Sequence, residues 1–265
     1  MTLLTGLSWP VAATSVSALA CLGFLLVCYR LFRLRQDHST ALFAVAMISV
    51  ATTAPVLQFA YAEALAFFLV AAVLLLISHR HYLAAAPLVV LAALTRPLGA
   101  PLLGTILVVT VASVISARRA GDRLQLGSLA VLVAAGGVGV VAWPLIAAMV
   151  TGVPDAYLAT EAAWRGGLML GPLEAYSGSL AAIFEQAAPV VGVVGVLGVA
   201  AVMLSRPVLR LGLVLWTWIG MVLGYLVLVA PVSTSLPRLL AAAFPLAAAA
   251  SGASRSRAYR WLLVV

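Results

Sequence analysis

Long apolar runs, separated by short polar connections that mostly carry arginine, make up almost the whole chain. Because a membrane-crossing helix needs about 20 mostly apolar residues, the pattern predicts an all-α, polytopic membrane protein with about nine transmembrane helices. The expected helices cover residues 11–29, 40–58, 61–78, 82–95, 98–117, 126–150, 187–204, 211–230 and 239–253. They leave no sizeable soluble region, so residues 1–265 are expected to form a single transmembrane domain.

Composition narrows the class of protein further. The 265 residues are 65% hydrophobic and only 8% charged, whereas an ordinary soluble domain is about 25% charged. A soluble enzyme, a disordered chain and a disulfide scaffold are therefore excluded. The net charge of +8 fits cytoplasmic connections rich in arginine, so we expect no nucleic-acid partner. The absence of lysine, with abundant Ala, Val and Leu, is typical of GC-rich coding and favours a bacterial source.

The distribution of charge predicts the orientation. If the N-terminus lies outside, twelve of the fifteen arginines fall in cytoplasmic connections, and five of the seven acidic residues fall on the outer side. This arrangement obeys the positive-inside rule and predicts a multi-pass protein of the cytoplasmic membrane with its N-terminus outside. Only Arg96, Arg165 and Arg238 remain on the outer side, so these three arginines need another explanation.

Arg96 is expected at the apex of a short hairpin. Basic residues flank residues 82–117 at both ends, so the stretch must turn back, and the turn is Thr95-Arg96-Pro97. At about 1.5 Å per residue the first arm rises only ~20 Å, less than the ~30 Å hydrocarbon core. Arg96 would thus lie below the outer surface, where a charged turn must be buried in protein or face a watered cavity. Pro97 breaks the helix and biases Arg96 toward an extended backbone.

Two more charged residues are expected near this apex. Glu63 begins the third apolar run at the outer edge, and Arg238 follows Pro237 at the outer mouth of the ninth. A carboxylate and a guanidinium at similar depth predict one polar cavity that opens outward. The alternative is that Glu63 and Arg96 pair only to lower the cost of burial.

The one long connection, residues 151–186, is expected to be an extracytoplasmic loop. Its segment from Asp155 through Glu161 to Arg165 has the pattern of a short amphipathic helix, with Trp and Tyr suited to the membrane interface. Such a helix either rests on the membrane or covers the cavity as a lid.

Outward-facing arginines suit a phosphate ligand, because the guanidinium stays charged and offers paired donors to phosphate oxygens. An anionic lipid headgroup is therefore the expected ligand. If the ligand is a polyprenyl-phosphate sugar, Arg96 and Arg238, with Arg165 as a third candidate, would hold the leaving phosphate. A carboxylate would then deprotonate the hydroxyl of the acceptor that attacks the sugar.

Three motifs also carry a resemblance to a known family. They are Pro55-Val-Leu-Gln-Phe-Ala-Tyr61-Ala-Glu63-Ala-Leu65, His79-Arg-His-Tyr82 and Leu91-Ala-Ala-Leu-Thr95-Arg96-Pro97-Leu-Gly99. In order and spacing they resemble the core of GT-C glycosyltransferases, nearest the bacterial PIG-V-like mannosyltransferases. Residues 155–165 resemble the long outer loop of that family, and Leu236-Pro237-Arg238-Leu-Leu with Phe244-Pro245-Leu246 resembles a later segment.

The resemblance implies an inverting transfer of one sugar, mannose in the nearest members. The donor would be a polyprenyl-phosphate sugar on the outer face of the cytoplasmic membrane, and the acceptor a lipid, a glycan or a protein. No cofactor follows from it with certainty. A divalent metal stays open, because the acidic pair usual in the superfamily is absent from this chain.

One departure from the family bears on activity. Members place an essential acidic residue on the outer loop after their first helix, whereas no acidic residue precedes Asp37 here. Three explanations stay open: a truncated gene product, a second polypeptide that supplies the missing N-terminal module, or a protein that binds the lipid without catalysis. Glu63, Asp155 and Glu161 are the candidates for a replacement base.

A different class of function also fits these features. A transporter or flippase for an anionic solute or lipid would use Arg96 on a broken hairpin as a binding site near the middle of the membrane. Transport predicts access from both sides and needs no general base. A structural membrane subunit is the third alternative.

Overall fold

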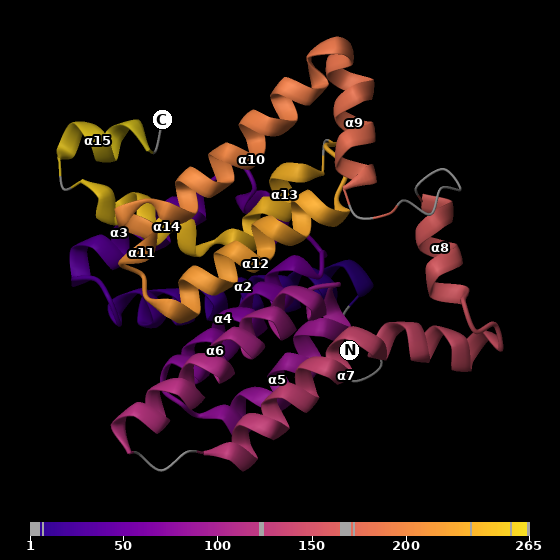
Figure 1. Ribbon diagram of the computed structural model, residues 1–265, viewed down its shortest axis with the longest axis horizontal. Helices are drawn as coiled ribbons and strands as arrows, with labels where there is room; N and C mark the ends of the chain where they lie inside the picture. The colour runs from indigo at the N-terminus through magenta and orange to yellow at the C-terminus, as the bar shows by residue number, and fades with distance from the viewer. Residues whose placement is uncertain are drawn as a thin grey trace.

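The computed structural model describes residues 6, 8–121, 125–164, 171, 173–233, 235–254 and 256–263. Over these residues the chain forms helices and no strand (Figure 1), which confirms the all-α class. The α-helices are α2 (Trp9–Arg33), α3 (His38–Val50), α4 (Glu63–Ser78), α5 (Tyr82–Thr95), α6 (Gly99–Ala120), α7 (Leu126–Thr151), α8 (Ala156–Trp164), α9 (Glu174–Phe184), α10 (Ala188–Leu204), α11 (Arg206–Leu209), α12 (Leu213–Val229), α13 (Leu236–Leu240), α14 (Pro245–Ala253) and α15 (Arg257–Leu262). Three 3-10 turns, η1 (Ala54–Leu57), η2 (Glu185–Ala187) and η3 (Ala241–Ala243), lie between them.

Each predicted apolar run coincides with a helix, but two runs do not stay helical to their expected ends. The run 40–58 ends early, because α3 stops at Val50 and Pro55 lies in η1. The run 239–253 is broken into α13, η3 and α14, with a bend of 71° before Pro245. Proline lacks the N–H that a continuing helix needs, which explains the break before Pro245.

The helices are typical of a membrane protein in length and composition. Among the described residues, four segments are long and apolar enough to cross a membrane by length and composition: α2, α6, α7 and the stretch Glu174–Leu204, which includes the turn η2 between α9 and α10. The bent pair α13–α14 makes a fifth if it counts as one span. The remaining apolar helices, α3, α4, α5 and α12, are shorter.

Helix α4 lies at the centre of the bundle. Most of its 16 residues are buried, and it packs against α2 on one side and α5 on another. A helix that is apolar all round is expected in such a position. Because α4 begins at Glu63, its place in the bundle puts that carboxylate at the end of the protein core.

The α5–α6 hairpin is held against α7 by a close approach of two backbones. A Cβ atom added to Gly99 would lie 2.6 Å from the carbonyl oxygen of Gly139, and one added to Gly139 would lie 2.9 Å from the Cβ of Ala93. Only glycine allows this contact. Since Gly99 is the first residue of α6, the contact fixes the turn that precedes it.

The segment expected as a long loop is mostly helical where the structure describes it. A helix, α8, lies where a short helix was expected; it contacts the neighbouring α7 and stands apart from the other helices in Figure 1. Helix α9 folds back on α10, since added Cβ atoms at Gly192 and Gly195 would meet Leu180 and Tyr176. The N–H of Leu173 donates a hydrogen bond of 2.8 Å to the carbonyl of Leu228 and ties α9 to the end of α12.

Candidate functional site

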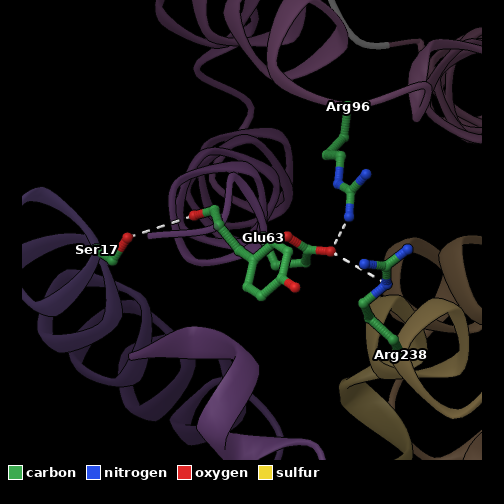
Figure 2. Close-up of polar contacts among 5 residues, drawn as sticks. Ser17, Glu63, Arg96 and Arg238 are labelled. Atoms are coloured by element: carbon green, nitrogen blue, oxygen red, sulfur yellow. Dashed lines mark hydrogen bonds and ion pairs between the residues drawn. The ribbon is translucent and has the colours of Figure 1, made fainter. Parts of the chain in front are cut away.

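Glu63, Arg96 and Arg238 meet at one end of the bundle, although each comes from a different element (Figure 2). Arg96 Nη2 forms an ion pair with Glu63 Oε1, and Arg238 Nε lies 3.4 Å from the same oxygen. The structure therefore brings Glu63, Arg96 and Arg238 together in one cluster, as the sequence predicted.

Glu63 is placed by the start of α4. It is only 2% exposed, and it lies in the first turn of that helix, where the partial positive charge of the helix dipole favours a carboxylate. The hydroxyl of Ser17 donates a hydrogen bond of 3.3 Å to the carbonyl of Tyr61, which attaches the segment before Glu63 to α2. Helices α2 and α4 therefore hold Glu63 in place.

Arg96 is placed by the turn between α5 and α6. The structure confirms the turn at Thr95-Arg96-Pro97: α5 ends at Thr95, and Arg96 is extended, with φ −152° and ψ 154°. This conformation is the one that a following proline imposes. Just before the turn, the carbonyl of Leu94 in α5 accepts a hydrogen bond of 3.0 Å from the indole N–H of Trp143 in α7. The bond satisfies one of the carbonyls left over at the end of α5.

Arg238 comes from α13, the short helix that precedes the bend. Its guanidinium carbon lies 5.9 Å from the centre of the Tyr61 ring, a distance suited to a cation–π contact. Tyr61 therefore links the two sides of the cluster, since its carbonyl binds α2 while its ring lies against the arginine.

The three charged residues line a cavity of about 70 Å³, which we call the Arg96–Arg238 pocket. Apolar and aromatic residues complete its wall: Phe67, Pro97, Leu98, Pro101, Val222, Tyr225, Leu226, Leu239 and Ala242. A cavity needs about 10–15 Å³ to hold one water-sized group, so roughly five such groups fit. This is enough for a phosphate group, whereas a hexose ring would have to lie in the opening of the cavity.

The charges in the Arg96–Arg238 pocket do not cancel. Two guanidiniums face one carboxylate, and among the described residues Glu63 is the only acidic residue in the pocket wall. Each guanidinium has five N–H donors, and only one nitrogen of each is paired with Glu63. The side chains of Arg96 and Arg238 are 28% and 33% exposed, so donors remain for an anionic ligand.

Three other predicted site residues do not join the cluster. Asp155 precedes α8 and Glu161 lies within it; neither lines the Arg96–Arg238 pocket, and α8 packs on α7. The described residues of α8 contribute nothing to the wall of the pocket. Arg165 lies outside the described residues.

The sequence left a metal site open. In the part of the chain that the structure describes, no three His, Cys, Asp or Glu side chains gather in a way that could hold a metal ion. Glu63 is accompanied by two cations, which makes its surroundings unsuited to a further cation.

Sequence reasoning missed several residues that shape the pocket. Tyr225 lies within the apolar run of α12 and Trp143 within that of α7, and neither had a neighbouring polar residue to mark it. Tyr61 belonged to a quoted motif, but no pattern in the sequence placed its ring against Arg238.

Comparisons of the chain with models of known protein families, with curated proteins and with solved structures find no match.

Proposed function

We propose that the protein is a membrane glycosyltransferase of the GT-C type that takes its sugar, mannose by the resemblance, from a polyprenyl-phosphate donor. Arg96 and Arg238 bind the phosphate of this donor. The observation that carries the proposal is the pair of guanidiniums around a single buried carboxylate, in a pocket with room for a phosphate group.

The electrostatics of the pocket favour a phosphate over a neutral ligand. The pocket keeps one net positive charge, and guanidiniums present paired donors that match phosphate oxygens. Phosphate is also the group that leaves when a sugar is transferred from such a carrier, and fixed cations stabilise the charge that develops on it.

An apolar cavity beside the pocket supports a ligand with a lipid tail. This second cavity has a volume of about 320 Å³, and Phe24, Leu57, Phe67 and Phe244 are among its lining residues. Phe67 lines both cavities, and η3 contributes Ala241 to one and Ala242 to the other. A molecule with a phosphate head and an isoprenoid chain could place each part in an environment of matching polarity.

The base that activates the acceptor is a separate question. Glu63 is engaged by both arginines, which suits it for holding them in place and makes it a poor proton acceptor. Asp155 and Glu161 remain candidates, and we propose a second polypeptide as a further source of the base. A divalent metal at that second component stays compatible with the proposal.

The proposed topology places the pocket on the outer face of the cytoplasmic membrane. Nine spans, formed by α2, α3, α4, α5, α6, α7, α10, α12 and the bent pair α13–α14, bring Glu63, Arg96 and Arg238 to the same outer side. The distribution of arginine supports this orientation. It also leaves the acceptor, whether lipid, glycan or protein, outside the cytoplasm.

Donor binding is the first test. The full chain in lipid nanodiscs is titrated with a polyprenyl-phosphate mannose, and Arg96→Ala and Arg238→Ala are compared with Arg118→Ala, which removes an exposed arginine at the end of α6. We expect each pocket variant to lose at least tenfold in affinity and the control to lose none. Unchanged affinity in both pocket variants would overturn the assignment of the phosphate site. Transfer of labelled mannose by membranes that contain the chain then tests the activity itself.

A second candidate function, a transporter or flippase for an anionic lipid, is favoured by one observation. Arg238 lies on a helix that breaks by 71° beside the pocket, and broken helices at the binding site are typical of transporters. Uptake of a labelled anionic lipid into proteoliposomes, without sugar transfer, would support transport. Binding with neither uptake nor transfer would point to a non-catalytic membrane subunit.

A further inference from the structure

A second polar cavity lies at the opposite end of α4 from the Arg96–Arg238 pocket. It has a volume of about 270 Å³, and the turn between α2 and α3, the α11 segment and the end of α14 enclose it. Arg35 lines this cavity and also an adjoining one that includes Ser78, the last residue of α4. Since the 16 residues of α4 rise about 24 Å, the two arginine pockets are separated by most of the thickness of a membrane.

Two arginines from distant parts of the chain give this cavity its charge. Arg35 follows α2 and Arg210 follows α11, and within the described part of the chain neither forms an ion pair with a carboxylate. The guanidinium of Arg35 lies over the backbone of Gly212, where an added Cβ atom would come within 3.0 Å of Nε and Nη2. Gly212 has a φ of +84°, which favours glycine and keeps this space open.

A buried acceptor lies beside the two arginines. Gln36 Nε2 donates a hydrogen bond of 2.6 Å to the carbonyl of Ala248, which fixes the orientation of the amide. Gln36 Oε1 is buried and has no hydrogen-bond partner among the described residues. A buried acceptor without a donor is costly, and the side chain that carries this one lines the cavity.

The acidic residue in the same wall has a structural task. Asp37 accepts hydrogen bonds from the backbone N–H and the hydroxyl of Thr40, both at 3.0 Å, and so caps the start of α3. Two arginines against one carboxylate leave the cavity with one net positive charge.

We propose that this Arg35–Arg210 cavity binds a phospholipid headgroup. The phosphate contacts Arg35 and Arg210, and a hydroxyl or ammonium group on the headgroup donates to Gln36 Oε1. Glycerol and ethanolamine headgroups carry such a donor, whereas choline carries none. In the proposed orientation the site faces the cytoplasmic leaflet, so it is distinct from the site proposed for the sugar carrier and does not depend on it.

The choice of headgroup gives a direct test. The delipidated full chain is titrated by native mass spectrometry with phosphatidylglycerol, phosphatidylethanolamine and phosphatidylcholine of identical acyl chains. We expect the first two lipids to bind about tenfold more tightly than the third, since one satisfied buried acceptor is worth about that factor. Equal binding of all three lipids would overturn the role of Gln36.

Matched variants distinguish binding in this cavity from nonspecific attraction to the arginines at this end of the protein. Arg35→Ala and Arg210→Ala should each lose about tenfold or more for all three lipids. Arg206→Ala, which removes an exposed arginine at the start of α11 that does not line the cavity, should lose nothing. Gln36→Met should lower the affinity for phosphatidylglycerol to that of phosphatidylcholine. A loss in Arg206→Ala equal to that in Arg210→Ala would refute a defined site.

A soluble competitor distinguishes the source of the phosphate. Glycerol phosphate should fail to displace phosphatidylglycerol at concentrations near that of the lipid, because it lacks the acyl chains that hold a lipid beside the protein. Displacement at equal concentration would overturn the lipid assignment and indicate a soluble phosphorylated ligand. Arg210 is exposed at the end of α11, so Arg210→Ala should fold and keep the test decisive even if Arg35→Ala does not.

Discussion

Replacing Glu63 by glutamine should change stability and ligand binding in opposite directions. The substitution keeps the size of the side chain and removes its charge, which leaves Arg96 and Arg238 side by side. Removing one member of a buried ion pair costs about 3–5 kcal/mol. Because the two arginine side chains are 28% and 33% exposed, water screens part of this cost, and we expect a loss of about 2–3 kcal/mol.

The same substitution should strengthen the binding of a phosphate. The net charge of the pocket rises by one unit, and Glu63 no longer repels a phosphate held by both arginines, which would lie about 6 Å from the carboxylate. At an effective dielectric constant of about 20–40 this repulsion is worth roughly 1.5–3 kcal/mol, or about 10–100-fold in affinity. The wild-type carboxylate thus holds the arginines in place and weakens their hold on an anion.

Two measurements check this prediction. Thermal unfolding of Glu63→Gln, followed by tryptophan fluorescence, should shift down by about 5–10 °C, and titration with a polyprenyl phosphate should show tighter binding than wild type. A variant that is less stable and also binds more weakly would refute the electrostatic reasoning. If sugar transfer is lost while binding tightens, Glu63 also takes part in the reaction.

The remaining predictions concern the turn that carries Arg96. Gly99→Ala should cost about 1–3 kcal/mol in unfolding experiments and weaken phosphate binding, because its Cβ would press on the backbone of α7. Gly137→Ala is the matched control. Its Cβ meets nothing within 4 Å, so this variant should not lose stability. Trp143→Phe should cost about 1 kcal/mol and lower phosphate affinity, since the carbonyl of Leu94 loses its donor; unchanged affinity would show that this bond does not position the turn. Arg96→Lys should keep most of the stability yet bind phosphate about tenfold more weakly in the same titration, because lysine lacks the planar fork.

The turn at Arg96 could be predicted from the sequence because its causes are local. Pro97 restricts the residue before it, and the basic residues at both ends of the hairpin fix where the chain must reverse. The meeting of Glu63 and Arg96 followed from depth alone, since both were expected near the same side of the membrane. Local steric restrictions and the distribution of charge were therefore enough to predict the turn at Arg96 and its proximity to Glu63.

The surroundings of the site could not be predicted, because a helix that is apolar on every side does not reveal which face packs against what. The contact between Gly99 and Gly139 and the hydrogen bond from Trp143 join segments about 40–50 residues apart. Nothing in their spacing distinguishes these residues from their neighbours. For the same reason the sequence could not show whether Asp155 and Glu161 lie beside Arg96; in the structure neither lines the Arg96–Arg238 pocket.

The positions of the three charged residues along the chain have a consequence for the assembly of the protein. Glu63 is the first residue of α4 and Arg96 directly follows α5, so they can neutralise each other as soon as the α4–α5 hairpin has entered the membrane. Arg238 is synthesised much later, and membrane helices generally insert before they pack together. Early insertion intermediates therefore carry a neutral pair, and the pocket acquires its positive charge only when the last helices dock. A nascent chain that has not yet folded its C-terminal helices has no cationic site with which to capture an anionic lipid prematurely.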